Sequence, residues 1–318
     1  MYIFIMNPIA GKGRAKTIYA KLQKNEYFQK LNTVSFCTKY KGHAEEIAKS
    51  LHRKYRETDI TLIVVIGGDG TMHEVINGLK NKQIPISFIP SGSGNDFARG
   101  TSTPKNINKL MQNIYETNTS VPYWFGSYLS KNGEKRNFVN CLGFGFDAVV
   151  AQQANQSKIK KVFNRLRCGS LVYLYALIRS LFTFKPFIIK MELDQRTKVF
   201  KRCFLLTINN HPYFGGGMKI NPQARNNGEH FSILVIDSIS KWKVLALFFT
   251  VFFGKHLHFK EVSTYTAQKI TCYANHSIPY QVDGETGSTS FCTMIKQPLP
   301  MQVKGCSKMV QNNRNHIN

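Results

Sequence analysis

Residues 62–71 read LIVVIGGDGT, in which five apolar side chains are followed by a glycine-rich segment. A continuous apolar run of this length is typical of a strand that is buried on both faces of a parallel sheet. The next residues, 71–79, place their apolar side chains on one side of a helix. A strand, a glycine turn and a helix in this order put the turn where α/β sheets bind their ligands. The stretch therefore predicts an α/β domain with a ligand-binding loop.

The same alternation of strand and helix extends over the first third of the chain, which is an α/β signature. In the segment 43–55, apolar residues recur at the i, i+3, i+4 and i+7 spacing of one helix face. We expect strands at 2–6, 33–38, 62–66 and 86–90, and helices at 14–24, 43–55 and 71–79.

The sequence pattern changes after Pro122, where short apolar strands and turn signals predominate. Asn132-Gly133 is a hairpin signal, so antiparallel pairing is expected around it. We expect strands at 123–129, 136–142, 187–193, 199–209, 231–236, 261–266, 269–273 and 290–295, and helices at 171–182 and 241–253. The predicted division is an α/β domain at 1–122, joined by the C-terminal segment 297–318, and a mainly β domain at 123–296.

The chain of 318 residues carries a formal net charge of +25, from 43 Lys plus Arg against 18 Asp plus Glu. Such a charge favours polyanionic partners, which include nucleotides, nucleic acid and anionic lipid. The basic residues are spread along the chain rather than massed in one arm, so a basic surface that only aids solubility is an alternative. No motif for reading nucleic acid bases is present, and we expect no specific nucleic acid partner.

Cysteine usage and apolar segments indicate the compartment. The seven cysteines are an odd set without a Cys-x-x-Cys pair, which argues against a disulfide framework and a thiolate zinc site. The N-terminus lacks the basic and long apolar regions of a signal peptide. The apolar stretches 168–184 and 244–253 are shorter than the roughly 20 residues of a spanning helix. We expect each to be a core helix or a helix lying on the bilayer surface, in a cytoplasmic protein that associates peripherally with the membrane.

The segment Gly67–Thr71 has the composition of a phosphate-binding turn. Glycines let the main chain close on phosphate oxygens, and the start of the following helix favours an anion. Thr71 is expected to cap that helix. The carboxylate of Asp69 would repel a phosphate unless Mg²⁺ bridges the two or the carboxylate orients a hydroxyl. Asp69 therefore predicts a metal-bound nucleotide or a role in catalysis.

Two further loops follow predicted strands, and residues 91–96 add small hydroxyls and a carboxylate at the same sheet edge. Residues 7–13, Asn-Pro-Ile-Ala-Gly-Lys-Gly, offer amides and Lys12, although they lack the spacing of a P-loop. In the β-rich half, residues 282–285 place two carboxylates on one side if the segment is extended; a turn is the alternative. The glycine runs 142–147 and 214–218 suit either the lining of a groove or strand bulges.

Taken together, four motifs resemble the diacylglycerol kinase catalytic-domain family, in its bacterial soluble lipid kinase form. They are Gly-Gly-Asp-Gly-Thr at 67–71, Asn-Asp-Phe-Ala-Arg at 95–99, three glycines at 215–217 and Val-Asp-Gly-Glu at 282–285. NAD kinases also carry the first motif, so the conjunction is what points to lipid kinases. The resemblance implies an NAD kinase/diacylglycerol kinase-like α/β domain, a C-terminal β-sandwich domain, and a cleft in which Mg·ATP meets a lipid hydroxyl.

The resemblance also implies roles for individual residues. Glu285 would be the general base that takes the hydroxyl proton, and Asp69 would support the metal or the nucleotide. Asn95 and Asp96 would contact the substrate. The residues implied to bind ATP are Asn7, Pro8, Ile9, Ala10, Gly11, Thr38, Gly67, Gly68, Asp69, Gly70, Thr71, Met72, His73 and Ser93.

The chain departs from the family pattern at a few positions. Ala10 stands where the family usually has Ser, and His73 where Asn is common. Asn227 replaces the aspartate of a structural metal site, and Glu229 is the nearest acid. An auxiliary Mg²⁺ site at Asn227 and Glu229 would therefore be weakened or lost, while the Mg²⁺ that accompanies ATP is unaffected.

The acceptor and the assembly state stay open at this point. Diacylglycerol is the first expectation for the acceptor, with a sphingoid base and other lipid alcohols as alternatives. A kinase acting on a soluble molecule such as NAD, and a basic nucleic-acid-binding protein without catalysis, are the competing functions. The sequence is compatible with both a monomer and a homodimer.

Overall fold

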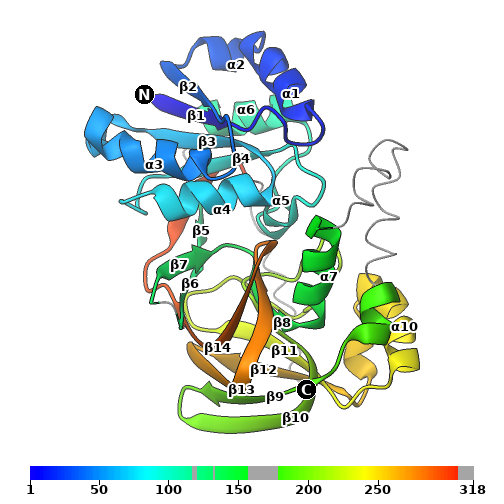
Figure 1. The fold of residues 1–318 in the computed structure, drawn as a ribbon. Coiled ribbons are helices and arrows are strands. Elements are labelled where there is room, and N and C mark those ends of the chain that lie inside the picture. The colour runs from blue at the N-terminus through cyan, green and yellow to red at the C-terminus, as the bar shows by residue number, and fades with distance from the viewer. Residues whose placement is uncertain (117–119, 132, 157–177, 307–318) are drawn as a thin grey trace, which may run out of the picture. The chain divides into compact units, whose positions relative to one another are not determined.

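The computed structural model describes residues 1–116, 120–131, 133–156 and 178–306 (Figure 1). The chain forms two compact units, Met1–Tyr123 with the segment from Pro300 onward, and Trp124–Leu299. Among the described helices, none has the length and apolarity needed to cross a membrane.

A six-stranded sheet forms the middle of the first unit. Its first four strands are parallel. The other two strands come from the segment just before the second unit in the sequence and from the segment just after it. The order is β2 (Thr33–Cys37), β1 (Tyr2–Met6), β3 (Leu62–Gly67), β4 (Ile86–Pro90), β15 (Met301–Lys304) and β5 (Ser120–Tyr123). All six residues of β3 are buried, as its continuous apolar run predicts.

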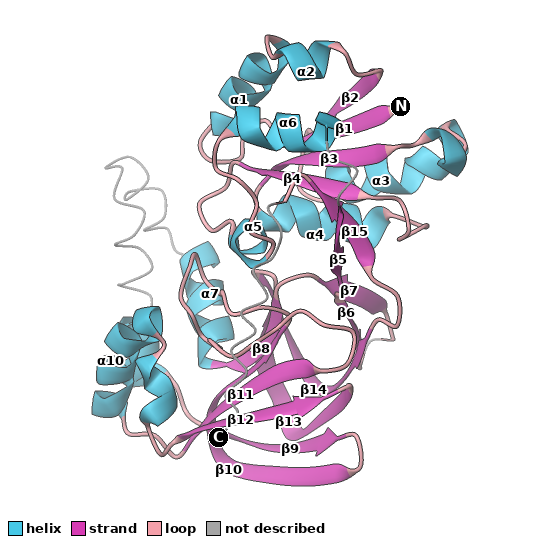
Figure 2. Ribbon diagram, turned by 180° about the vertical axis from the view of Figure 1, so that it is seen from behind, coloured by secondary structure: helices cyan, strands magenta, loops and turns pink. Residues whose placement is uncertain are grey.

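Helices cover both faces of this sheet (Figure 2). One face packs against α1 (Arg14–Gln23), α2 (Glu26–Gln29) and α6 (Ile107–Glu116). The other carries α3 (His43–Lys54) and α4 (Asp69–Gly78), with the short α5 (Asp96–Gly100) after β4. Alternate strand residues supply the two cores, since successive side chains of a strand point to opposite faces.

The start of α4 differs from the sequence prediction. The helix begins at Asp69, and its N-cap residue is Gly68, which has no side chain that could cap the helix. The predicted capping role of Thr71 is therefore wrong, because Thr71 lies inside the first turn. Its hydroxyl instead accepts a hydrogen bond from Asn7 Nδ2 at 3.1 Å.

The second unit is built on a nine-stranded antiparallel sheet. Its strands are β6 (Gly126–Ser130), β7 (Lys135–Phe138), β8 (Cys141–Gly145), β9 (Phe187–Leu193), β10 (Arg196–Asn209), β11 (Phe231–Asp237), β12 (Val262–Ala267), β13 (Lys269–Val282) and β14 (Glu285–Lys296). Strands β8 and β9 each pair with both β10 and β13, which closes a ring of four strands. A large apolar cluster, built mostly from side chains of these strands, forms the core of the second unit.

Helices flank the sheet of the second unit. They are α7 (Phe146–Gln156), α10 (Lys241–Thr250) and the short η2 (Val251–Phe253) and η3 (Lys255–His258). Leu181, Val244 and Val251 share an apolar cluster with Leu234 and Ile236 of β11. Residues 178–183 are helical, in agreement with the end of the helix expected at 171–182, whereas 171–177 and the tail 307–318 lie outside the described residues.

The predicted fold class, an α/β unit followed by a mainly β unit, is confirmed. Two predicted strands are wrong. The segment 136–142 is broken between β7, which ends at Phe138 and pairs with β6, and β8, which begins at Cys141 and pairs with β10 and β13. The segment 123–129 is divided between the two sheets. Tyr123 ends β5 in the first sheet, and β6 begins at Gly126 in the second. Local sequence could not reveal this division, because both pieces are apolar and β5 takes its partner from β15, far along the chain.

Candidate functional site

Three glycine loops meet at the carboxyl ends of β1, β3 and β4. They are the segments 7–13, 67–71 and 91–95, and main-chain hydrogen bonds tie each to its neighbour. Asn7 N donates to Ile66 O at 2.9 Å, and Ser91 N donates to Gly67 O at 2.8 Å. The sequence prediction that these loops share one sheet edge is in accord with this arrangement.

Two close approaches in this cluster require glycine. Gly11 has a φ of 60°, and a Cβ there would lie 1.9 Å from Ser91 O. A Cβ on Gly92 would lie 2.7 Å from the Cα of Gly68. The main chains of the three loops therefore touch directly, and their amides are gathered in a small volume.

Unpartnered polar atoms occur at the same place. In the part of the chain that the structure describes, Ser91 Oγ and Asn95 Oδ1 are buried and have no hydrogen-bond partner. Lys12 and Arg14 are exposed beside Gly11 and add positive charge to the first loop. Converging amides, cationic side chains and the start of the ten-residue α4 are the features that bind phosphate groups.

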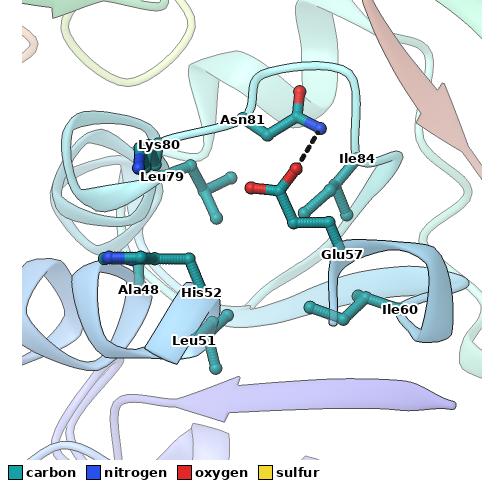
Figure 3. Close-up of a pocket in the computed structure, with 9 residues that line it drawn as sticks. All are labelled: Ala48, Leu51, His52, Glu57, Ile60, Leu79, Lys80, Asn81 and Ile84. Carbon is teal, nitrogen blue, oxygen red and sulfur yellow. Dashed lines mark hydrogen bonds between the residues drawn. The ribbon is translucent and has the colours of Figure 1, made fainter. Parts of the chain in front are cut away.

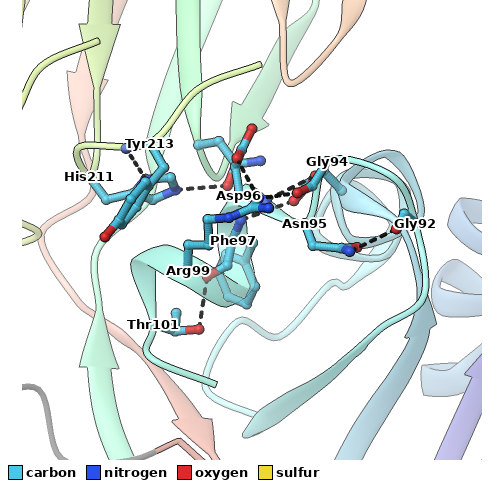
Figure 4. Close-up of polar contacts among 11 residues, drawn as sticks. Gly92, Gly94, Asn95, Asp96, Phe97, Arg99, Thr101, His211 and Tyr213 are labelled. Carbon is cyan, nitrogen blue, oxygen red and sulfur yellow. Dashed lines mark hydrogen bonds and ion pairs between the residues drawn. The ribbon is translucent and has the colours of Figure 1, made fainter. Parts of the chain in front are cut away.

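The carboxylate of Asp69 holds the third loop in position. Its two oxygens accept hydrogen bonds from the main-chain amides of Asp96, at 3.1 Å, and Phe97, at 3.0 Å. Asp69 therefore caps α5, whose own N-cap residue Asn95 donates from Nδ2 to Gly92 O at 2.8 Å (Figure 4). Arg99 Nη1 lies 3.0 Å from Asp96 Oδ1. This is a positioning role, and the expected support of a metal by Asp69 stays a prediction.

A second acid on α4 does the same for α3. Glu74 accepts hydrogen bonds from Gly42 N, at 2.9 Å, and Ala44 N, at 3.1 Å, at the start of that helix. Sequence reasoning missed Glu74, since nothing local to residue 74 indicates a partner 30 residues away. Through Asp69 and Glu74, α4 fixes the helices on either side of it.

The predicted ATP-binding residues differ in how far they are exposed to solvent. Ile9 is 78% exposed, and Gly11, Gly70 and Ser93 are also exposed. By contrast, the side chains of Thr38, Thr71, Met72 and His73 are buried. Any contact that Met72 or His73 makes with a ligand would therefore use the main chain. Thr38 N donates to Met6 O at 2.8 Å, which places Thr38 at the same sheet edge as the loops.

A small pocket in the first unit is unrelated to these loops (Figure 3). It lies among the ends of α3 and α4 and the segment before β4, with Leu51, Ile60 and Leu79 in its lining. Asn81 Nδ2 donates to Glu57 Oε2 at 2.9 Å at its rim. Its volume of about 10 Å³ suits a single water molecule. The pocket sits at the amino ends of β3 and β4, opposite the glycine loops.

In the second unit, residues 282–285 form a turn, so the extended alternative is wrong. Val282 pairs with Glu285 across the β13–β14 hairpin. Asp283 and Gly284 have φ values of 50° and 93°, which are the positive values of a type I′ turn. The Asp-Gly dipeptide between two strand patterns is the signal for this turn, which the sequence analysis kept as the alternative.

Asp283 fixes this turn to a neighbouring segment. Its carboxylate accepts hydrogen bonds from three consecutive main-chain amides, those of Val139 and Asn140 at 2.8 Å and of Cys141 at 3.1 Å. The half-buried Glu285 consequently has a defined place as the first residue of β14.

A buried acid lies near the same turn. Gln281 Oε1 accepts a hydrogen bond from Gly284 N at 3.0 Å, and Gln281 Nε2 donates to Asp147 Oδ2 at 3.2 Å. Burial raises the pKa of Asp147 from 3.8 to about 7. Among the described residues, Asp147 Oδ1 is buried without a partner. Sequence reasoning treated 142–147 only as a glycine run, and the acid at its end was the signal to pursue.

A polar network supports the segment that Asp283 contacts. His211 Nε2 donates to Asn140 Oδ1 at 2.9 Å. The Nδ1 atom of His211 accepts from Tyr213 N at 3.2 Å (Figure 4). Burial lowers the pKa of His211 to about 4, so its ring is neutral. Lys296 Nζ donates to Asn210 Oδ1 at 2.8 Å, and burial lowers the pKa of Lys296 to about 7. The backbone near Asn140 is therefore held from two sides.

The predicted auxiliary metal ligands do not form a set that suits Mg²⁺. Asn227 Oδ1 accepts from the amides of Glu229, at 3.3 Å, and His230, at 3.2 Å, and so closes a turn. The side chain of Glu229 is 77% exposed. Within the described ranges, no three His, Cys, Asp or Glu side chains gather to hold a metal. Mg²⁺ prefers several oxygen ligands in octahedral geometry, which one turn amide and one exposed acid do not supply.

Comparison with known proteins adds to this geometry. The family model "Diacylglycerol kinase catalytic domain" matches residues 1–122, and "YegS C-terminal NAD kinase beta sandwich-like domain" matches residues 140–304. The chain is 35% identical over 308 residues to "Putative lipid kinase YtlR" of Bacillus subtilis (strain 168), covering 95% of this chain and 99% of that protein. It is 29% identical over 208 residues, 65% of each chain, to "Diacylglycerol kinase" of Mycobacterium tuberculosis (strain ATCC 25618 / H37Rv).

A solved structure agrees with the fold. The crystal structure of "a putative diacylglycerol kinase from Bacillus anthracis str. Sterne" superposes with a TM-score of 0.70 at 22% identity, over 95% of this chain and 94% of that one. Similarity at this identity speaks for the architecture alone. The chain is 35% identical to the Bacillus subtilis relative over nearly the whole length of both proteins, and both of its domains match family models. This chain therefore belongs to the diacylglycerol kinase catalytic-domain family.

Proposed function

We propose that the protein transfers the γ-phosphoryl group of ATP to a hydroxyl of a membrane lipid, with diacylglycerol as the acceptor and phosphatidic acid as the product. The observation that carries this proposal is the convergence of three glycine loops at the carboxyl edge of a parallel sheet. Main-chain amides from these loops would bind the phosphates, and the exposed Lys12 and Arg14 would offset their charge.

The γ-phosphoryl transfer is mostly a matter of positioning and charge neutralisation. In our proposal, the Glu285 carboxylate accepts the proton of the acceptor hydroxyl, and the oxygen of that hydroxyl forms a bond to the γ-phosphorus. The bond from that phosphorus to the bridging oxygen breaks, and ADP leaves. A general base of this kind contributes about 10²- to 10⁴-fold to a rate.

Two residues near Glu285 would act by positioning it. The turn held by Asp283 fixes the backbone of Glu285, and Gln281 joins that turn to Asp147. Asp69 and Glu74 would act in the same indirect way on the nucleotide loops, since both cap helices that border them. Mg²⁺ would arrive with the nucleotide and neutralise phosphate charge, and no step is assigned to the turn at Asn227.

A lipid acceptor is supported by the relatives' names and by the charge of the chain. We propose a cytoplasmic protein that works at the membrane surface, because a net charge of +25 favours contact with anionic lipid headgroups. The same charge alone would also suit a soluble polyanion, so the acceptor class needs a direct test.

The test is a panel of acceptors with [γ-³²P]ATP. Diacylglycerol, a sphingoid base and another lipid alcohol are offered in mixed micelles, and NAD is offered in solution. Label in phosphatidic acid supports the proposal. Label in NAD with none in any lipid would replace it by a soluble-substrate kinase, and label in the sphingoid base alone would change the acceptor while keeping the lipid kinase.

A further inference from the structure

The helix α10 and the turn η2 that follows it are apolar on two opposite faces. The inward face consists of Val244, Leu247 and Val251, which pack in the cluster shared with β11. The outward residues 242, 246, 249 and 253 follow the i, i+4, i+7 and i+11 spacing of one helix face. A helix needs only one apolar face to pack on its own unit, so the second face requires another explanation.

The outward face carries large exposed aromatics. Trp242 is 75% exposed, Phe249 71% and Phe253 77%, and Phe252 beside them is 45% exposed. Phe248 contacts both Phe249 and Phe252, with ring centroids 6.0 and 5.8 Å apart. No other stretch of twelve described residues exposes as many large apolar side chains. Such a concentration marks an interaction surface rather than ordinary surface variation.

The neighbouring helical segment adds to this surface. Ile178 and Phe182 are exposed, and Leu181 between them packs in the same cluster as α10. Lys241 Nζ donates to Phe182 O at 2.7 Å and lies 5.9 Å from the ring of Phe182. We call Ile178, Phe182, Trp242, Phe249, Phe252 and Phe253 the aromatic face. In Figures 1 and 2, α10 lies at the side of the second unit, outside its sheet.

The charges around the aromatic face select its partner. The segment 238–260 contains four lysines, at 241, 243, 255 and 260, and no aspartate or glutamate; of these lysines, Lys243 pairs with Glu261 just beyond the segment. Lysines occur both before the first outward aromatic and after the last. Aromatic side chains that enter the headgroup region, flanked by cations that contact anionic headgroups, are the features of helices that lie in a membrane interface.

The aromatic face rests on a firm support. Ser240 caps α10, its Oγ accepting from Lys243 N, and Lys243 Nζ contacts Glu261 Oε1 at 2.5 Å. Beyond the helix, the buried His256 bonds through Nε2 to Ile220 O at 2.7 Å. The outward aromatics are thus presented by a fixed helix, which lowers the entropic cost of insertion.

From these observations we infer that the aromatic face is the surface by which the protein docks on an anionic lipid bilayer, with Trp242, Phe249 and Phe253 inserted at the interface. The inference rests on the proposed lipid acceptor, and it adds the surface that carries the enzyme to its substrate. The net charge of +25 strengthens the choice of an anionic bilayer as the occupant.

The docking test uses vesicles and requires no catalysis. Partition of the full chain onto vesicles of phosphatidylglycerol and phosphatidylcholine is measured by sedimentation, without ATP. The triple variant Trp242→Ser, Phe249→Ser, Phe253→Ser is expected to lower the partition coefficient about tenfold or more, since interfacial binding scales with buried apolar area. A matched variant changes three other exposed apolar residues of the same unit, Leu129→Ser, Ile188→Ser and Val199→Ser, and is expected to bind as the parent does.

Fluorescence checks the position of the face directly, because the chain has two tryptophans. In a Trp124→Phe background, Trp242 is the reporter, and its emission should shift to the blue and be quenched by brominated lipid. Equal partition of the two triple variants, or a Trp242 spectrum unchanged by vesicles, would overturn the inference. A blue shift without lipid that grows with protein concentration, together with a dimer mass in light scattering, would also overturn it in favour of a second copy.

The outcomes separate this inference from the proposed function. If the parent protein phosphorylates diacylglycerol and the aromatic triple variant still partitions normally, the docking surface is wrong and the kinase stands. If vesicle binding depends on the aromatic face but no lipid is phosphorylated, the surface stands and the kinase fails. With a water-soluble short-chain diacylglycerol, the triple variant is expected to keep the parent's rate.

Discussion

Replacement of Gly11 by alanine should impair ATP use far more than replacement of Gly13, although the two glycines lie in one loop. Both have left-handed φ values, 60° and 90°, so either alanine carries a strain of about 1–2 kcal/mol. At Gly13 a Cβ would meet nothing within 4 Å. At Gly11 it would lie 1.9 Å from Ser91 O, where real contacts are almost never under 3.0 Å, so the first and third loops must separate by about 1.1 Å.

A displacement of about 1 Å in groups that position a substrate can lower a rate about 10²-fold. We therefore expect Gly11→Ala to lower kcat/KM for ATP about 100-fold and Gly13→Ala only a few-fold. The assay varies ATP at fixed diacylglycerol in mixed micelles, and urea unfolding of both variants checks that each is folded. Equal losses in the two variants would refute the idea that contact between the loops shapes the nucleotide site.

Two further predictions concern acidic side chains, the half-buried Asp69 and the buried Asp147. Asp69→Ala should lower the free energy of unfolding by about 1–2 kcal/mol in urea, because α5 loses its cap, whereas the exposed control Asp59→Ala should change it little; equal effects would contradict the capping role. The pKa of Asp147 is raised to about 7, so between about pH 4 and pH 7 the folded state keeps a proton that the unfolded state has lost. The contribution of Asp147 to the free energy of unfolding is therefore greatest below about pH 4 and falls as the pH rises to about 7. Asp147→Asn should remove this slope of up to about 1.4 kcal/mol per pH unit, and an unchanged slope would refute the assignment.

The parallel half of the fold was predictable because its signals are local. A strand such as 62–66 that is apolar at every position, followed by glycines and an amphipathic helix, has few alternative structures. The loops at 7–13, 67–71 and 91–95 could be placed at one edge for the same reason, since parallel strands end together.

Other features depend on partners distant in sequence. The strand β15 has four residues, and it completes the first sheet only because β4 and β5 lie beside it. The capping of α5 by Asp69 joins residues 27 apart, and that of α3 by Glu74 joins residues about 30 apart. A lone acid in a glycine loop gives no indication of which amides it will contact.

The turn at Asp283 is a different case, because its signal was present. Asp-Gly between alternating strands is typical of a type I′ hairpin. The expectation of an extended segment rested on the spacing of the two carboxylates and gave less weight to this backbone preference of Asp-Gly. The three amides that hold Asp283 come from residues 139–141, and only the fold brings them to it.

The most direct test of the proposed mechanism compares two properties of Glu285→Gln with those of the parent protein. One is the dissociation constant for ATP, measured by calorimetry, and the other is the rate at which label from [γ-³²P]ATP enters diacylglycerol. Because Glu285 is assigned to the hydroxyl proton and not to the nucleotide, the dissociation constant should be unchanged while transfer falls about 10²- to 10⁴-fold. Transfer at the parent's rate by Glu285→Gln, or no labelled lipid from the parent itself, would contradict the account.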